Sequence, residues 1–448
     1  MKMRMVSLIL AGMLANGCAS TGTNRLGHNE AERADGPGAT MLALGEESTL
    51  DDYLRYAALN NPGLEAAFND WKAAVERVPQ AKALPNPRLT YSYFIEEVET
   101  RVGAQRQKIE VSQVFPWFGK LRLRGDAASD AAHAAEQKYQ GIKLALFYRV
   151  KNTYYEYGYL GRALVITREN IKLLSNLENV ALSMYKSGAA PHAAVIKIQV
   201  ELGRLQDRLT TLEDRRNSMS AQLNAALNRS SNAPLPWPKP FQEERTDVSE
   251  EELIAWVRES NPELKALEFM ASKEKAGVEL AEKNYYPDIM LGVGTVLTDD
   301  ASMPNVEDSG KDPIIAVIAI DLPLWYGKYR AAEREARHRH EAALRKKTDR
   351  ENNVLADLQL ALFNVRDAHR QIDLYGDTLI PKAKQSLEVT QTGFEAGKVD
   401  FLNLIDAERL LLEFQLSYER ALANHAQTLA QLEMLVGRSI PRAGGGEE

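Results

Sequence analysis

Two halves of this chain of 448 residues carry the same landmarks in the same order, and this duplication constrains the fold more than any other feature. The motif FPWFGK at 115–120 recurs as LPLWYGK at 322–328, each time after a run that alternates apolar and polar residues. Further landmarks repeat at offsets of 200, 200, 207 and 209, namely Pro62 with Pro262, Pro87 with Pro287, Pro116 with Pro323, and Gly188 with Gly397. Chance does not readily produce such an ordered set, so we predict an internal duplication.

The duplication sets the expected domain boundaries. The first repeat is predicted over residues 49–229 and the second over 249–440. The segment SSNAPLPWPKPF at 230–241 is too rich in proline to be helical, so residues 230–248 are predicted to be a linker. Residues 441–448 are predicted to be a flexible tail.

The N-terminus is typical of a targeting segment. Lys2 and Arg4 precede the short apolar run MVSLILAGMLA, so residues 1–17 are predicted to be a secretory signal peptide. Cys18, the only cysteine, stands where a bacterial lipoprotein signal is cut, which predicts lipidation of Cys18 and a lipid-anchored extended segment over 18–48. The alternative is an incidental cysteine in a discarded signal.

Each half is predicted to run as helix, strand, loop, strand, very long helix, turn and helix. The first helices are expected at 51–84 and 249–284. Residues 120–186 contain no proline, and a helix of that length would be about 100 Å long. The second copy is expected from about 328 to 395, with Pro381 as one interruption. The last helix has a coiled-coil seam at Tyr418, Leu422, His425, Leu429, Leu432 and Val436.

Four strands are expected, each with one apolar face. Leu89, Tyr91 and Tyr93 alternate with polar residues, and segments around 109–115, 289–294 and 314–322 follow the same pattern. This is the weak signature of outer-membrane barrel strands, and an ordinary half-buried soluble sheet is the alternative. Because a sheet edge cannot face lipid and small membrane barrels need about eight strands, four strands per chain would require several chains to share one barrel.

The composition and motifs do not indicate an enzyme. A net charge of −7 argues against nucleic acid as a partner. The sequence contains neither a phosphate-binding loop nor a nucleophile elbow, and the seven histidines are scattered. His338 and His340 are two residues apart, so on a helix they would point in different directions and form a poor metal pair. No catalytic residue, cofactor or metal site is predicted.

With these features the chain resembles the outer membrane efflux proteins of the TolC family. The likeness rests on the signal with Cys18, the duplication, the two strand pairs, the corners QVFPWFGKLRLR and LPLWYGKYRAAEREA, and the turns near Gly188 and Gly397, and it covers about residues 45–440. The corners are most similar to the branch serving heavy-metal and small-cation efflux. The resemblance implies a mainly α fold in which three chains build a shared 12-stranded β-barrel, continued by a long α-helical barrel through the periplasm.

The resemblance places the two corners where strands leave the membrane and become helices. Prolines would end the strands, glycines would allow the sharp turn, and aromatic residues would lie in the interfacial belt. Lys120 and Lys328 could then reach lipid phosphates. A soluble strand-to-helix loop that contains aromatics is the alternative. The corner residues are Pro116, Trp117, Phe118, Gly119, Pro323, Trp325, Tyr326 and Gly327.

The resemblance also implies a pore gate within GKVDFLNLIDAE at 397–408. In the family two aspartates one helical turn apart close the pore; Asp406 matches the second, and Asn403 stands in place of the first. Val399 and Phe394 replace an arginine and a tyrosine that restrain some members. The alternative is that Asp406 decorates a solvated helix face. The tips that would meet a periplasmic adaptor contain Ser187, Gly188, Ala189, Ala396, Gly397 and Lys398.

The function implied is a passive exit duct in the outer membrane for small solutes, either metal cations or drugs. It would work as a homotrimer with a periplasmic adaptor and an inner-membrane pump of the RND type, and would contact outer membrane lipids. Two alternatives remain open: an exit duct for type I protein secretion, and a periplasmic coiled-coil tether with no pore.

Overall fold

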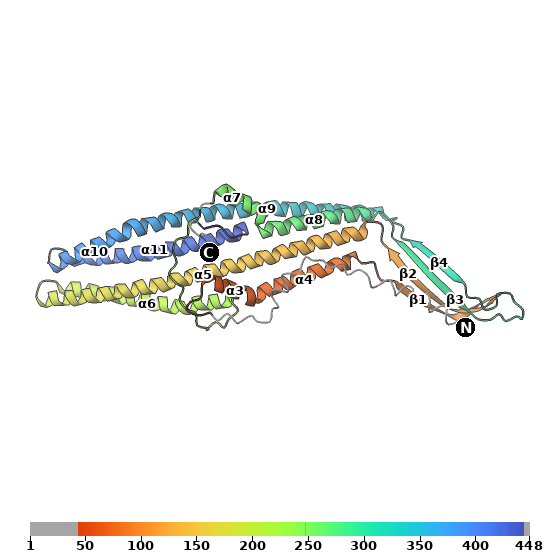
Figure 1. The fold of residues 1–448 in the computed structure, drawn as a ribbon, viewed down its shortest axis with the longest axis horizontal. Coiled ribbons are helices and arrows are strands. Elements are labelled where there is room, and N and C mark those ends of the chain that lie inside the picture. Colours follow the sequence, from red (N-terminus) through yellow and green to blue (C-terminus); the bar gives the residue numbers. More distant parts are fainter. Residues whose placement is uncertain (1–43, 247, 443–448) are drawn as a thin grey trace. The chain divides into compact units, whose positions relative to one another are not determined.

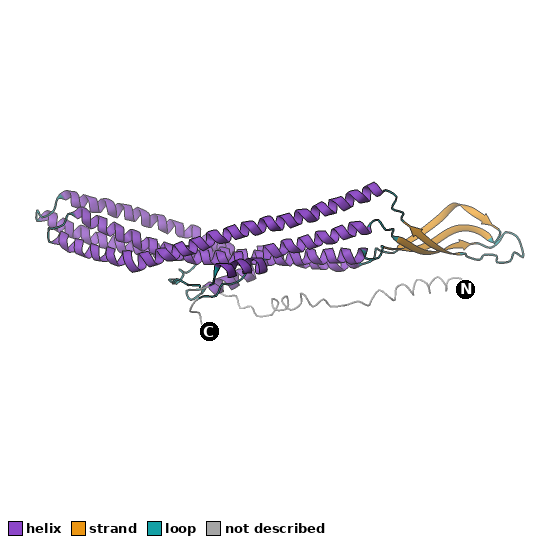
Figure 2. Cartoon of the chain, turned by 90° about the horizontal axis from the view of Figure 1, so that it is seen from above, coloured by secondary structure: helices purple, strands orange, loops and turns teal. Residues whose placement is uncertain are grey.

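The computed structural model describes residues 44–246 and 248–442. Cys18, the predicted signal peptide, most of the predicted anchored segment and residues 443–448 of the predicted tail lie outside these ranges. The described chain is mostly helix with one four-stranded sheet, which agrees with the mainly α fold class (Figure 2). The sheet lies at one end of the long helices (Figure 1). At the other end lie the turn between α5, Lys120–Lys186, and α6, His192–Ala226, and the turn between α10, Ile380–Glu395, and α11, Phe401–Val436.

Each repeat begins with two helices where the sequence predicts one. In the first repeat these are α3, Leu50–Asn60, and α4, Pro62–Lys82; in the second they are α7, Glu250–Ser260, and α8, Pro262–Lys283. The helices break before proline because a residue in that position is pushed out of the helical region. The side chain of Asn61 caps the next helix at Leu64 N–H (3.1 Å), and Asn261 does the same.

The same asparagines dock each helix pair onto the end of a later helix. The amide of Asn61 donates to the Ala226 carbonyl at 3.0 Å, and that of Asn261 donates to the Leu435 carbonyl at 2.8 Å. The donors are 200 residues apart and the acceptors 209 apart, which are offsets of the sequence repeat. The duplication is therefore present in the contacts as well as in the element order.

The long helices follow the prediction closely. Helix α5 runs over Lys120–Lys186 without a break, and α6 follows over His192–Ala226. The second copy is divided into α9, Tyr326–Asp373, a π-helical segment η1, Leu374–Leu379, and α10, Ile380–Glu395, before α11, Phe401–Val436. The interruption predicted at Pro381 is confirmed: proline has no N–H, and it lies in the first turn of α10 directly after the π-helical segment.

The sheet is an antiparallel meander in the order β1-β2-β3-β4. Its strands are β1, Arg88–Thr100, β2, Gly103–Phe115, β3, Ile289–Thr298, and β4, Ile314–Ile320. The register pairs Tyr91 with Ile109, Val111 with Val293, and Leu291 with Ile318, so apolar residues from all four strands share one face.

No described helix covers that apolar face. Its side chains are exposed, among them Leu89, Tyr91, Tyr93, Leu291, Ile314 and Ile318. This is the opposite of a half-buried soluble sheet, in which the apolar face packs against a core. Among the described helices, none combines the length and the apolar character that a membrane crossing requires.

The linker between the repeats is non-helical, as predicted, but it is packed and not free. The ring of Trp237 stacks on Tyr157 with centroids 4.5 Å apart. A side chain at Gly161 would come within 2.9 Å of Trp237, and one at Gly158 within 2.6 Å of Phe241. Glycines on α5 therefore let the linker lie directly against that helix.

Candidate functional site

The two helical tips have the same backbone structure. Gly188 and Gly397 both adopt a left-handed conformation, with φ of 78° and 69°. In the first tip the N–H of Ala189 donates to the Met184 carbonyl at 2.8 Å, and in the second that of Lys398 donates to the Gly393 carbonyl at 2.8 Å. In addition, the N–H of Gly188 donates to the Tyr185 carbonyl at 3.0 Å, and that of Gly397 donates to the Phe394 carbonyl at 2.9 Å. Together these bonds form two Schellman motifs, which need a left-handed residue after the helix.

A pair of rings closes each tip. Tyr185 contacts His192 with centroids 4.9 Å apart, and Phe394 contacts Phe401 at 5.5 Å. Phe394 is buried, and the side chain of Val399 packs over Gly393. The second tip is thus held by apolar contacts at the two positions where the family resemblance implies a tyrosine and an arginine.

The predicted gate residues lie on the exposed face of the first turns of α11. Asn403 and Asp406 are both exposed, one turn apart, and 72% of the Asp406 side chain is accessible. The opposite face, which contains Leu404 and Ile405, is buried. The gate, in which copies of Asp406 from several chains converge, stays a prediction.

An ion pair that the sequence analysis missed lies beside Asp406. The guanidinium of Arg409 donates to Glu201 on α6 at 2.5 Å and lies 3.8 Å from the Asp406 carboxylate. Glu201 is buried and also accepts from Arg204 at 3.2 Å. The start of α11 is therefore tied electrostatically to α6, and Asp406 belongs to that network.

Glu408, also missed, lies in the interior of the same helical end. Its exposed fraction is 0%, and neither carboxylate oxygen has a hydrogen-bond partner among the described residues. Burial and, to a smaller extent, the charge of Glu201 raise the pKa of Glu408 to about 7, while the charge of Arg409 opposes the rise. Position 408 falls on the apolar seam between Leu404 and Leu412, a spacing that could have indicated its burial.

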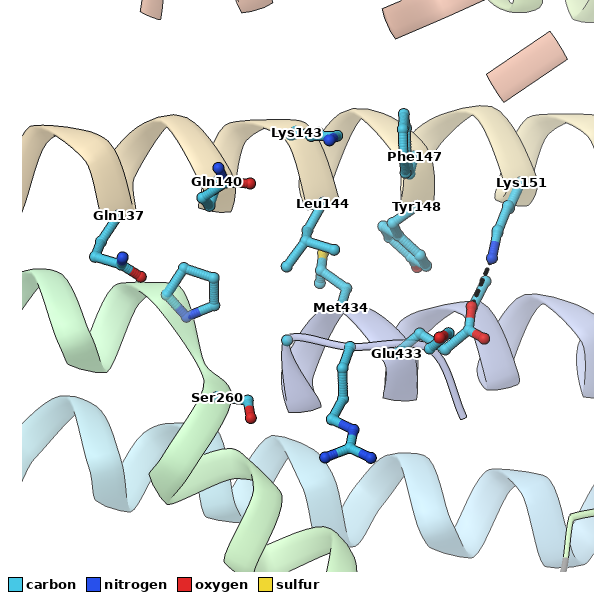
Figure 3. Close-up of a pocket in the computed structure, with 15 residues that line it drawn as sticks. Gln137, Gln140, Lys143, Leu144, Phe147, Tyr148, Lys151, Ser260, Glu433 and Met434 are labelled. Atoms are coloured by element: carbon cyan, nitrogen blue, oxygen red, sulfur yellow. Dashed lines mark hydrogen bonds and ion pairs between the residues drawn. The ribbon is translucent and has the colours of Figure 1, made fainter. Parts of the chain in front are cut away.

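Farther from the tips, ion pairs join α5 of the first repeat to α11 of the second. Glu156 accepts two hydrogen bonds from Arg420, at 2.6 and 3.1 Å, and Lys151 donates to Glu433 at 2.6 Å (Figure 3). Burial is the largest single influence and would raise the pKa of Glu156. The hydrogen bonds and charge of Arg420, the charge of Arg215 and a hydrogen bond from Gln427 together outweigh burial, and the pKa is lowered. Glu156 is therefore held as a carboxylate in this seam between the repeats.

The first corner is anchored to the start of β3. The Trp117 N–H and the Lys120 ammonium both donate to Asp288 Oδ1, at 2.8 and 2.7 Å, and the Trp117 ring stacks on Tyr286. Lys120 is only 4% exposed. The expectation that Lys120 reaches lipid phosphates is therefore wrong, because its charge is neutralised inside the chain.

The second corner differs from the first in its backbone. Gly119 has a φ of 87° and directly precedes α5, whereas Gly327 is the second residue of α9 and is not left-handed. The prediction that Gly327 provides a sharp turn is wrong, because the chain already turns before it: Leu324 N–H donates to the Leu322 carbonyl at 2.9 Å and Tyr326 N–H to the Leu324 carbonyl at 3.1 Å. Pro116 follows the last residue of β2 directly, as expected, and Phe118 and Trp325 are exposed.

Comparisons with known proteins agree with this geometry. The family model for the outer membrane efflux protein matches residues 54–229 and 253–438, which correspond to the two repeats. The cobalt-zinc-cadmium resistance protein CzcC of Cupriavidus metallidurans is 22% identical over 87% of this chain and 90% of its own length. The outer membrane protein TolC of Vibrio cholerae is 22% identical over 89% of this chain and 93% of its own length.

Solved structures share the fold at low sequence identity. A crystal structure of CusC superposes with a TM-score of 0.75 at 15% identity, over 87% of this chain and 92% of that one. VceC from Vibrio cholerae gives a TM-score of 0.72 at 17% identity, over 87% and 96%. With both repeats matched by the family model, the chain belongs to the outer membrane efflux protein family.

Proposed function

We propose that the protein is the passive outer membrane duct of a tripartite efflux system. The observation that carries this proposal is the four-stranded sheet, whose apolar face is exposed and whose edge strands β1 and β4 each pair with only one neighbour among the described strands. Unpaired edges cannot lie in lipid, so the strands need further chains to close. Three chains with four strands each would supply the 12 strands of a membrane barrel.

The partners follow from the two ends of the molecule. The Schellman tips at Gly188 and Gly397 would meet a periplasmic adaptor, and an inner-membrane pump of the RND type would provide the energy. The exposed rings of Phe118 and Trp325 suit the membrane interface, where aromatic side chains gather. A lipid on Cys18 would add a second anchor to the outer membrane.

Asp406 is proposed as the charged ring of the pore, with Asn403 one turn away. Three carboxylates close to one axis would attract a multivalent cation, and one ring would bind it more weakly than two. In single-channel recordings with a trivalent cation on the periplasmic side, Asn403→Asp should strengthen the block and Asp406→Ala should abolish it. Asp207→Asn, an exposed carboxylate on α6, is the matched control and should leave the block unchanged.

Each result decides a separate question. An absence of conductance in planar bilayers would favour a periplasmic tether over a duct. A conducting channel in which Asp406→Ala leaves cation block intact would remove Asp406 from the constriction without affecting the duct itself.

Metal cations are proposed as the cargo, in preference to drugs. The support is that the relative CzcC is named for cobalt, zinc and cadmium resistance. Deletion of the gene should raise cellular sensitivity to these metals, and reintroduction should restore resistance. Sensitivity to drugs alone would point to the other cargo, and loss of a secreted protein would favour the type I alternative.

A further inference from the structure

Three potential metal ligands converge where the linker crosses the second repeat. Glu243 comes from the linker, and His369 and Asp373 come from α9. One ligand atom from each lies within 4.8 Å of the other two, and all three residues are half-buried. His369 Nδ1 contacts the Glu243 carboxylate, and its Nε2 lies 3.6 Å from Asp373 Oδ2.

The fold fixes these residues from two directions. His369 and Asp373 are four residues apart on a helix, a spacing that puts two ligands on one face. Glu243 is two residues after Phe241, whose ring packs closely against Gly158 of α5 and against Tyr155 at a centroid distance of 5.3 Å. The segment that positions the Glu243 side chain beside α9 is therefore packed against α5 and is not a free loop.

The two carboxylates already share a cation in the structure. Arg245 lies 3.4 Å from Glu243 and 3.5 Å from Asp373. Its side chain is 61% exposed, so it can move into solvent with little loss of packing. A positive charge is thus favoured between these oxygens, and a divalent ion would satisfy them more fully than one guanidinium.

We propose that Glu243, His369 and Asp373 bind a divalent transition-metal ion of the zinc type, with water completing its coordination. Imidazole together with carboxylate suits zinc, nickel, copper and cobalt better than calcium or magnesium, which prefer all-oxygen sites.

Such an ion would bind the linker, which packs against α5 of the first repeat, to α9 of the second repeat. It would therefore stabilise the contact between the two repeats. This role is separate from any cargo, since the site lies at the junction of the repeats and depends neither on a pore nor on a pump. The site cannot be recognised as a local sequence motif, because Glu243 and His369 are 126 residues apart.

The test uses the full chain in detergent without a histidine tag, stripped with a chelator and titrated with Zn²⁺ against a chromophoric competitor. We expect one high-affinity Zn²⁺ per chain. Glu243→Gln and His369→Gln should each weaken its binding by at least ~10-fold, because the loss of even a group that only orients a metal ligand costs about 10- to 100-fold. His338→Gln, which removes an exposed histidine from the same helix, is the matched control and should leave the affinity unchanged.

A spectroscopic readout places the ion independently of affinity. Co²⁺ bound to the unmodified chain should give visible absorption bands of a four-coordinate ion, and His369→Gln should lose them. Melting of each variant in the absence of metal shows whether it is folded, and the Zn²⁺-induced rise of its melting temperature should vanish in His369→Gln. Unchanged affinity in both Glu243→Gln and His369→Gln, or dependence of the site on His338, would overturn the proposal.

Discussion

A glutamine in place of Glu408 should stabilise the chain at pH 8 and leave its stability at pH 4.5 unchanged. Glu408 is fully buried on α11 with both oxygens unpaired in the described structure, and its pKa is raised from 4.5 to about 7. The folded chain therefore keeps a proton that the unfolded chain releases near pH 4.5. Because the folded state binds more protons between these values, stability falls as the pH rises from 4.5 to 7 and is constant above.

The magnitude follows from the size of the rise in pKa. A change from 4.5 to about 7 corresponds to a cost on the order of 3 kcal/mol per chain for ionising Glu408 in place, at about 1.4 kcal/mol per pKa unit. Glutamine has nearly the same shape and never ionises. It buries an unpaired polar group as protonated Glu408 does, so the two chains should be equally stable at low pH.

Thermal melting in detergent at pH 5 and pH 8 measures this difference, and hydrogen exchange of α11 and α6 amides locates it. Relative to the unmodified chain, Glu408→Gln should raise the melting temperature clearly at pH 8 and much less at pH 5. Glu413→Gln changes an exposed carboxylate on the same helix and should not alter the pH dependence. An equal gain at pH 5 and pH 8 would refute the argument, because the effect would then not depend on ionisation.

Three further predictions test other parts of the chain. Gly119→Ala should lower the free energy of unfolding by about 1–2 kcal/mol, because Gly119 has a left-handed backbone. Gly327→Ala, which lies inside α9, should leave the free energy of unfolding unchanged or raise it by up to ~1 kcal/mol. Thermal melts of the two variants measure both effects. Glu156→Gln should cost about 2 kcal/mol by leaving Arg420 without its counter-charge, and the double variant with Arg420→Met should cost less than the sum of the single changes in thermal melts. Mass spectrometry of the mature protein should show an acylated N-terminal Cys18; a mature chain that begins at another residue would contradict lipidation.

Much of the fold could be predicted because its signals are local and repeated. The absence of proline over 120–186 gave α5 with its observed bounds, and Pro381 marked the break in the second copy. The splits at Asn61 and Asn261 were missed, although the residue before a proline seldom stays helical. Repetition also misled, since Gly327 was given the role of Gly119 although only Gly119 is left-handed.

The site was less predictable because its contacts join distant segments. Lys120 was expected to face lipid, but Asp288, 168 residues away, neutralises it. The ion pair of Arg409 could not be predicted from the sequence either, because its partner Glu201 lies on another helix. Which acid meets which base is decided by the packing of helices against each other, and helical periodicity describes only one helix at a time.

The π-helical segment η1 also bears on how the two halves have diverged in evolution. The offset between the copies is 208 residues at Lys120 and Lys328, where the long helices begin, and 209 at the tips, so the second long helix is one residue longer than the first. Within a regular α-helix each added residue would rotate everything beyond it by about 100° and turn its buried side outward. Leu374–Leu379 winds with more residues per turn, so extra residues can be taken up there locally. A lineage can therefore change the length of one copy without first remodelling its partner, provided that the insertion falls where such a wide turn can form.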